Sequence, residues 1–265
     1  MFISCKSSVN SRGEKIETAV TILPYAGIVK EIGGEKVNVT VLVPPQSACE
    51  TYEPSPIDIA KTTNSEIYFA VGAGYAFEKN LLKTIKENYK SLAVVDCSEG
   101  SIIKENNPHL WLSIEGVKKI AGLVCSSLIK ARPGLEQYFT LNKEKFFTRA
   151  DSINSIIENN LKQIKNRKIM VFHPSWLYFA VQYNLEQIAV EREGKEPTAR
   201  DLRNIVNTGK KFNIKTLFLE PNTAEESAEA LKEELKAGAV LLNPMEEDVL
   251  ENLLFVSQKI KESLN

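Results

Sequence analysis

The chain contains two histidines, and each lies in a short aromatic segment beside a proline. His109 lies in NPHLWL, residues 107–112, and His173 lies in FHPSWLY, residues 172–178. Imidazole nitrogen is a good ligand for zinc, copper, iron and nickel, and a neighbouring proline restricts the backbone that carries each ring. A single histidine near a core is more often a hydrogen-bonded structural residue. Two such segments in one chain predict a site for a divalent metal ion.

A third proline-bounded segment contains other types of metal ligand. Residues 44–54, PPQSACETYEP, follow an alternating apolar run and include Cys49, Glu50 and Glu53. Carboxylate oxygen and thiolate sulfur both bind zinc. Open α/β sheets bind their ligands beyond the carboxyl ends of the strands, and this segment and His173 both follow predicted strands. This segment is therefore a further source of candidate metal ligands.

A glycine-rich turn offers a different chemistry, that of dinucleotide binding. Residues 72–77, GAGYAF, follow a predicted strand, and Asp96 lies about 20 residues further on. The third glycine of the nucleotide-binding fingerprint is replaced by Phe77, which is too bulky for close helix–strand packing. The turn also follows the third predicted strand, whereas nucleotide domains place it after the first. We interpret it as an ordinary turn at a strand end.

Strand and helix patterns alternate along most of the chain, which is typical of parallel sheets covered by helices. The predicted strands are 16–23, 37–43, 66–71, 92–95, 168–172, 185–190, 215–219 and 239–242. The predicted helices are 25–33, 56–61, 76–89, 114–130, 175–183, 198–211, 223–236 and 246–264.

The region after Pro133 breaks this alternation. Residues 135–165 contain no glycine or proline, and their apolar positions recur at helical spacing. A helix of about 30 residues would be about 45 Å long; the alternative is two helices broken near Asn142. We expect an α/β fold of two lobes, 15–133 and 166–265, each a mostly parallel sheet flanked by helices and joined by one long helix, 134–165.

Composition excludes several classes of protein. The 265 residues are 43% hydrophobic and 25% charged, with a net charge of −1. A protein that tracks nucleic-acid phosphates would normally have a basic excess, so no nucleic-acid partner is expected. No apolar run approaches the roughly 18 residues of a membrane span.

The four cysteines contain no CxxC pair and do not make a disulfide scaffold. Three of them, Cys49, Cys97 and Cys125, fit buried positions, and the sequence leaves open whether Cys97 and Cys125 pair. The first, Cys5, lies in FISCKSS, which is similar to the end of a bacterial lipoprotein signal. We expect residues 1–14 to be a tether, and a lipid on Cys5 to be the only attachment to a membrane.

The motifs, in their order, resemble those of the metal-binding receptors of zinc- and manganese-type ABC importers, which are periplasmic or lipoprotein solute-binding proteins. The resemblance extends from Ile22 to Leu264. It rests on segments spread over both expected lobes: LVPP at 42–45, ETYEPSP at 50–56, the turn from Gly72 to Glu78, NPHLWL at 107–112, Tyr138 and Asn142, HPSWLYF at 173–179, GKEPT at 194–198 and FLEP at 218–221.

The resemblance implies a ligand set with two departures from the family pattern. His109 and His173 match family ligands, and manganese-type members usually have Glu at the second position. Glu50 replaces a family His, and Asn243 replaces a family Asp. We expect Glu50, His109 and His173 to bind the metal, with Asn243, a water or Cys49 as the fourth ligand. Zn²⁺ is the expected cargo, with Mn²⁺ and Fe²⁺ as alternatives; a further alternative is that the two departures abolish metal binding.

The resemblance also implies a function and a location. The protein would be a monomeric binding protein of the cell envelope, in the periplasm or on the outer face of the cytoplasmic membrane. It would capture the ion in the cleft between the lobes and deliver it to an ABC permease, while the long helix limits hinge opening. Tyr52, Glu53 and Glu220 are candidates for hydrogen bonds that orient the imidazoles. The alternatives are an adhesin-like surface lipoprotein and a metal-dependent hydrolase using Glu53 or Glu220 as base; we expect no enzyme activity.

Overall fold

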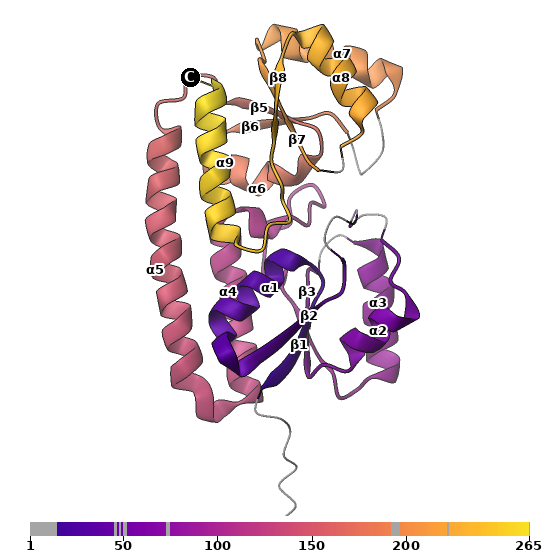
Figure 1. Cartoon of the computed structure of the whole chain (residues 1–265), viewed down its shortest axis with the longest axis vertical. Helices are drawn as coiled ribbons and strands as arrows, with labels where there is room; N and C mark the ends of the chain where they lie inside the picture. Colours follow the sequence, from indigo (N-terminus) through magenta and orange to yellow (C-terminus); the bar gives the residue numbers. More distant parts are fainter. Residues whose placement is uncertain are drawn as a thin grey trace, which may run out of the picture.

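Two parallel sheets lie one above the other in the computed structural model, and long helices run along one side of both (Figure 1). The structure describes residues 15–44, 47, 49, 52–72, 75–191, 197–221 and 223–264. The predicted α/β fold is confirmed. The division of the chain at 15–133, 134–165 and 166–265 remains a prediction.

The first sheet has the strand order β2-β1-β3-β4, with all strands parallel. Its strands are β1 (Ile16–Val20), β2 (Val37–Val41), β3 (Ile67–Ala70) and β4 (Ala93–Asp96). Its helices are α1 (Leu23–Gly33), α2 (Pro56–Thr63), α3 (Ala76–Asn88) and α4 (Ile114–Ala131). Helices α1 and α4 cover one face and α2 and α3 the other (Figure 1). Every residue of β3 is buried, as expected for a strand inside a doubly covered parallel sheet.

The second sheet has the equivalent order, β6-β5-β7-β8, and is also parallel throughout. Its strands are β5 (Lys168–Val171), β6 (Glu186–Ala189), β7 (Thr216–Leu219) and β8 (Gly238–Leu241). Its helices are α6 (Leu177–Gln182), α7 (Ala199–Lys211), α8 (Glu225–Leu235) and α9 (Val249–Leu264). The two sheets therefore share a topology, although the sequence contains no repeat.

The long helix is continuous and packs against helices associated with both sheets. Helix α5 spans Glu136–Leu161 and follows a 3₁₀ turn, Pro133–Leu135. It lies alongside α1, α4 and α9 (Figure 1). The alternative break near Asn142 is wrong: this residue lies within α5, where its Nδ2 donates to the Ile32 carbonyl at 3.0 Å. The helix is shorter than predicted at both ends: the tighter turn Pro133–Leu135 precedes it, and it ends at Leu161 rather than at residue 165.

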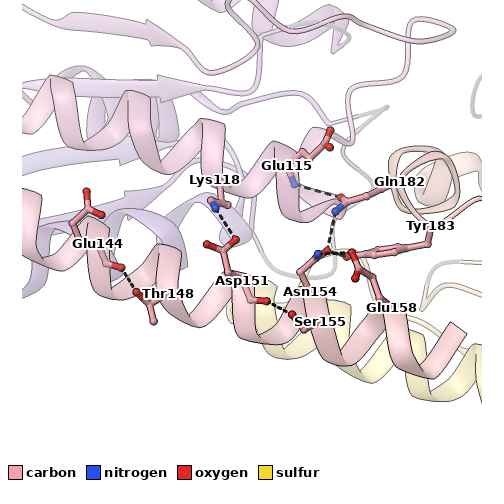
Figure 2. Close-up of polar contacts among 10 residues, drawn as sticks. All are labelled: Glu115, Lys118, Glu144, Thr148, Asp151, Asn154, Ser155, Glu158, Gln182 and Tyr183. Atoms are coloured by element: carbon pink, nitrogen blue, oxygen red, sulfur yellow. Dashed lines mark hydrogen bonds and ion pairs between the residues drawn. The ribbon is translucent and has the colours of Figure 1, made fainter. Parts of the chain in front are cut away.

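Polar side chains also fasten α5 to its neighbours (Figure 2). Asn154 Oδ1 accepts hydrogen bonds from Tyr183 Oη at 2.7 Å and from Gln182 Nε2 at 3.1 Å. The Oε1 atom of Gln182 accepts from the Glu115 backbone N–H of α4 at 3.4 Å. One glutamine side chain at the end of α6 therefore bridges α4 and α5.

The largest cluster of buried apolar side chains extends from β1 and α1 through α4 and α5 to β5, β7 and α9. Both tryptophans, Trp111 and Trp176, lie within it, as does Leu161 at the end of α5. Domains with separate cores move readily against each other. A shared core restricts the relative movement of these two sheets.

Candidate metal centre

The two histidines lie at the junction of the two sheets. His109 lies in the loop after β4, directly before a 3₁₀ turn, Leu110–Leu112. His173 lies two residues after β5 and before a second 3₁₀ turn, Pro174–Trp176. Their ring centres are 5.3 Å apart, and their planes are inclined by 73°. The chain thus brings together two imidazoles whose positions in the sequence are 64 residues apart (173 − 109).

This spacing is suited to two imidazoles on one ion. A zinc–nitrogen bond of about 2.0–2.1 Å places the centre of the ring about 3.2 Å from the metal. Two rings at a tetrahedral angle would then have centres about 5.2 Å apart. The observed 5.3 Å matches this value. The separation of the two rings is therefore compatible with both binding one tetrahedral ion.

Asn107 determines which nitrogen of His109 carries the proton. The Nδ2 atom of Asn107 donates to the Pro174 carbonyl at 2.7 Å, and its Oδ1 accepts the His109 backbone N–H at 3.0 Å. The same Oδ1 lies 2.8 Å from His109 Nδ1. Because this oxygen is an acceptor, Nδ1 must donate. The lone pair of the neutral His109 ring is therefore on Nε2.

Glu191 has the same effect on His173. Its Oε1 lies 2.5 Å from His173 Nδ1, and both side chains are 15% exposed. Glu191 comes shortly after β6, and β6 pairs with β5, so the two strand ends bring the groups together. The Glu191 backbone N–H also donates to the Phe172 carbonyl at 3.0 Å. A carboxylate on Nδ1 fixes the tautomer and increases the basicity of Nε2.

Trp111 connects the His109 segment to a third strand end. Its ring centre lies 5.0 Å from that of His109, and its Nε1 donates to the Pro244 carbonyl at 2.8 Å. The indole is fully buried. Since Pro244 follows β8, the His109 segment contacts the second sheet through both Asn107 and Trp111.

Asn243, the predicted fourth ligand, has its amide engaged in the turn between β8 and α9. Its Oδ1 accepts from the Met245 backbone N–H at 3.0 Å, and its Nδ2 donates to Glu246 Oε1 at 2.6 Å. Its backbone carbonyl accepts from Asn252 Nδ2 at 2.8 Å. A carbonyl oxygen has two lone pairs, so a ligand role for Asn243 remains a prediction that would use the second lone pair of Oδ1.

Two predicted residues, Glu50 and Cys5, lie outside the described residues. Cys49 is described: it is buried, and its Sγ lies 4.0 Å from the Ser47 carbonyl. Cys97 and Cys125 are buried as free thiols. Within the described ranges, no group of three or more His, Cys, Asp or Glu side chains could hold a metal ion. The two histidines therefore need a further donor from elsewhere to complete a site.

Two of the three candidates for orienting the imidazoles, Tyr52 and Glu220, have other partners in the structure. Tyr52 Oη donates to the Leu42 carbonyl at 3.2 Å and to Asp58 at 3.1 Å, and Glu220 accepts from Ser175 Oγ at 2.5 Å. The partners of the two Nδ1 atoms are Asn107 and Glu191. The signal for Asn107 was its position two residues before His109. Glu191 has a weaker signal, because it requires knowing that β5 and β6 are neighbours.

A model of the family described as "Zinc-uptake complex component A periplasmic" matches residues 19–257. This match covers most of the chain and includes both histidine segments. The chain belongs to this family. The predicted resemblance to metal-binding receptors of ABC importers is thereby confirmed. The family is one of periplasmic or lipoprotein binding proteins for transport, not of enzymes.

Solved structures and curated relatives agree with this assignment. Two structures of ZnuA, one of them a deletion mutant with zinc bound, are each 34% identical with a TM-score of 0.89. They cover 95% of this chain, which in turn covers 100% and 98% of theirs. The zinc uptake protein ZnuA of Bacillus subtilis is 23% identical over 92% of this chain and 82% of its own length. The manganese-binding lipoprotein MntA of Halalkalibacterium halodurans is 23% identical over 81% of this chain and 73% of its own length.

The family therefore includes receptors for zinc and for manganese at similar distances from this chain. In both cases the divalent ion is cargo and not a resident cofactor. Among the described residues, no helix combines the length and the apolar character that a membrane span requires.

Proposed function

We propose that this protein captures a divalent transition metal ion, preferentially Zn²⁺, and delivers it to an ABC permease. His109 and Glu50 would bind the ion from the first lobe and His173 from the second. The observation that carries the proposal is the pair of imidazoles 5.3 Å apart, each with Nδ1 hydrogen-bonded. In both rings this leaves the lone pair on Nε2, which is the atom a shared ion would bind.

Zinc is favoured over manganese by the donor atoms. Two imidazole nitrogens suit Zn²⁺ better than Mn²⁺, and Mn²⁺ stands at the weak end of the divalent affinity order. Overall identity does not separate the two metals, since the curated zinc and manganese relatives are each 23% identical. Glu50 would supply one carboxylate oxygen, so the site with a 2+ ion would have a net charge of +1.

The fourth ligand would be a water molecule, Asn243 or Cys49. Asn243 would add a neutral oxygen, and its hydrogen bonds to Met245 and Glu246 would hold it in the turn. A thiolate from Cys49 would increase the preference for zinc, so substitution Cys49→Ser separates this option from the others.

The experiment is a calorimetric titration of the metal-free protein with Zn²⁺ and, separately, with Mn²⁺ under reducing conditions. We expect one-to-one binding, with Zn²⁺ much tighter than Mn²⁺. Loss of a residue that hydrogen-bonds to a metal ligand typically lowers metal affinity by roughly 10–100-fold. His109→Ala and His173→Ala remove the ligands themselves, so each should lower zinc affinity by more than this. Ser126→Ala, an exposed change on α4, is the control and should bind like the wild type.

Two results would contradict the proposal. Tighter binding of Mn²⁺ would make the protein a manganese receptor, and no saturable binding of either ion would show that Glu50 and Asn243 have abolished the site. The adhesin alternative stays a prediction, and adhesion that survives in the His109→Ala, His173→Ala double variant would indicate a separate role.

A further inference from the structure

One side chain, Asn107, contacts both histidine segments. It is buried, with 7% exposure, in the loop that leads from β4 to His109. Its Oδ1 lies 2.8 Å from His109 Nδ1, and its Nδ2 donates to the Pro174 carbonyl, one residue after His173, at 2.7 Å. The amide thus spans the boundary between the segment that follows the first sheet and the segment that follows β5.

The backbone at Asn107 is also hydrogen-bonded to the part of the chain that follows His173. Its carbonyl accepts from Tyr178 Oη at 2.9 Å, and the same Oη accepts from the Lys104 backbone N–H at 3.1 Å. Tyr178 belongs to α6, the helix that follows the His173 segment. The loop from 104 to 107 is therefore held to α6 independently of the Asn107 side chain, and the amide has little freedom to leave its two partners.

The two ends of the amide cannot exchange roles. The Pro174 carbonyl is only an acceptor, so it requires a donor, and the His109 backbone N–H is only a donor, so it requires an acceptor. An aspartate at this position would have an acceptor at both ends. It could accept from His109 but could not donate to Pro174.

We propose that Asn107 is a positioning residue for both imidazoles. Its Oδ1 keeps His109 in the tautomer that has the proton on Nδ1. Its Nδ2 binds the Pro174 carbonyl and thereby maintains the distance between the two rings. The consequence for metal capture rests on the proposed function of the two histidines. Its physical basis is preorganisation: a ring already in the binding tautomer and orientation loses less freedom when the ion binds.

Nitrogen NMR of histidine-labelled protein tests the first part of the proposal without metal. Because the chain has two histidines, the spectrum contains four ring nitrogens. At a pH at which the ring-nitrogen shifts show both imidazoles to be neutral, both wild-type rings should carry their proton on Nδ1. In Asn107→Ala, His109 should redistribute toward the Nε2–H tautomer, whereas His173, held by Glu191, should not change. Asn107→Asp keeps the acceptor and should restore the wild-type tautomer of His109.

Zinc titration tests the second part. Asn107→Ala should weaken zinc binding by about 10–100-fold. The matched control is Asn154→Ala, which removes another amide that bridges helices but contacts neither histidine. It should leave the imidazole spectrum and the zinc affinity unchanged. Asn107→Ser carries the same expectation as the alanine variant and serves if that variant does not fold.

An Asn107→Ala spectrum in which His109 keeps the wild-type tautomer would overturn the proposal. A loss of zinc affinity no larger than that of Asn154→Ala would also overturn it, as would a loss of affinity without a change of the His109 tautomer. Either result would indicate that Asn107 has only a general packing role. A wild-type protein that binds no zinc would refute the proposed function instead, and the metal-free spectra would still decide the role of Asn107.

Discussion

The two imidazoles have partners of different charge. His173 faces the carboxylate of Glu191 at 2.5 Å, whereas His109 faces the neutral amide of Asn107 at 2.8 Å. A carboxylate partner polarises the ring more strongly than an amide and strengthens its Nε2 as a donor. We expect His173 to be the stronger of the two ligands.

Substitution Glu191→Gln tests this difference. Glutamine can still accept from Nδ1, but it has no charge, so we expect zinc affinity to fall by about 10–100-fold. Competition with a chelator of known affinity measures the change. Glu186→Gln, an exposed change on β6, is the control and should have no effect. Equal affinities of Glu191→Gln and wild type would show that the charge of this partner does not matter.

The sequence predicted the two ring positions but not the groups that orient them. His109 and His173 stood out because their types are rare and prolines lie beside them. Glu191 could not be recognised, because its contact depends on β6 pairing with β5 in the register that aligns Val171 with Ala189. That pairing is a property of the sheet, and no local pattern specifies it.

At the scale of the elements, a buried carboxylate joins α3 to the first sheet. Glu78 is fully buried near the start of α3 and accepts from the backbone N–H groups of Val71 at 3.0 Å and Gly72 at 2.7 Å. It also accepts from the hydroxyls of Tyr68 and Thr21. Gly72 has a φ of +87°, and an added Cβ would lie 1.9 Å from Asp96 Oδ1. The Glu78 carboxylate of α3 thus binds the backbone N–H groups at the end of β3.

Burial raises the pKa of Glu78, although its hydrogen bonds oppose the shift. The unfolded chain therefore releases this proton at a lower pH than the folded protein. Between the two pKa values the folded state holds more protons, so this group makes stability fall as pH rises from the ordinary carboxyl range near 4.5 through the raised pKa. In Glu78→Gln this component should be absent.

Urea denaturation of both proteins across that pH range measures the effect. The stability advantage of the wild type over Glu78→Gln should be largest at the acidic end and should decrease as the pH rises. A constant difference would mean that the pKa of Glu78 is the same in the folded and unfolded states.

Periodicity predicted the existence of the elements well, and their arrangement poorly. The alternation in β2 and the apolar face of α4 are local patterns and needed no tertiary information. The strand order β2-β1-β3-β4 depends on where each connection places the next strand in the sheet. The sequence of a single strand does not specify this. The start of α5 moved to Glu136 because a 3₁₀ turn at Pro133–Leu135 uses the residues that helical spacing had assigned to it.

At the scale of the whole molecule, α1 approaches the backbone that precedes α9 very closely. A Cβ added to Gly27 would lie 1.9 Å from the Glu247 carbonyl oxygen. Beside this contact Lys30 pairs with Glu247 at 2.6 Å, and Arg149 of α5 pairs with both Glu31 at 3.2 Å and Asp248 at 2.7 Å. Helix α1 of the first sheet is thus held against the segment before α9 of the second sheet by a close backbone contact and by ion pairs.

Substitution Gly27→Ala should therefore separate α1 from residue 247. We expect a loss of about 1–3 kcal/mol in the free energy of unfolding, as for other overpacked positions. Gly122→Ala in α4 is the matched control, because an added Cβ there meets no atom within 4 Å. It should be neutral or more stable by up to about 1 kcal/mol, since alanine is the better helix former. Similar changes at both positions, measured by urea denaturation, would contradict the close approach.

The position of the two tryptophans has a practical consequence. Trp111 follows His109 by two residues and Trp176 follows His173 by three, and these are the two indoles of the chain. Trp111 lies 5.0 Å from the imidazole of His109, with its N–H on the Pro244 carbonyl. Ultraviolet excitation of the unlabelled protein thus excites indoles only in the histidine segments. If an ion binds at these histidines as proposed, the surroundings of Trp111 change, so we expect intrinsic tryptophan fluorescence to follow metal binding without an added label.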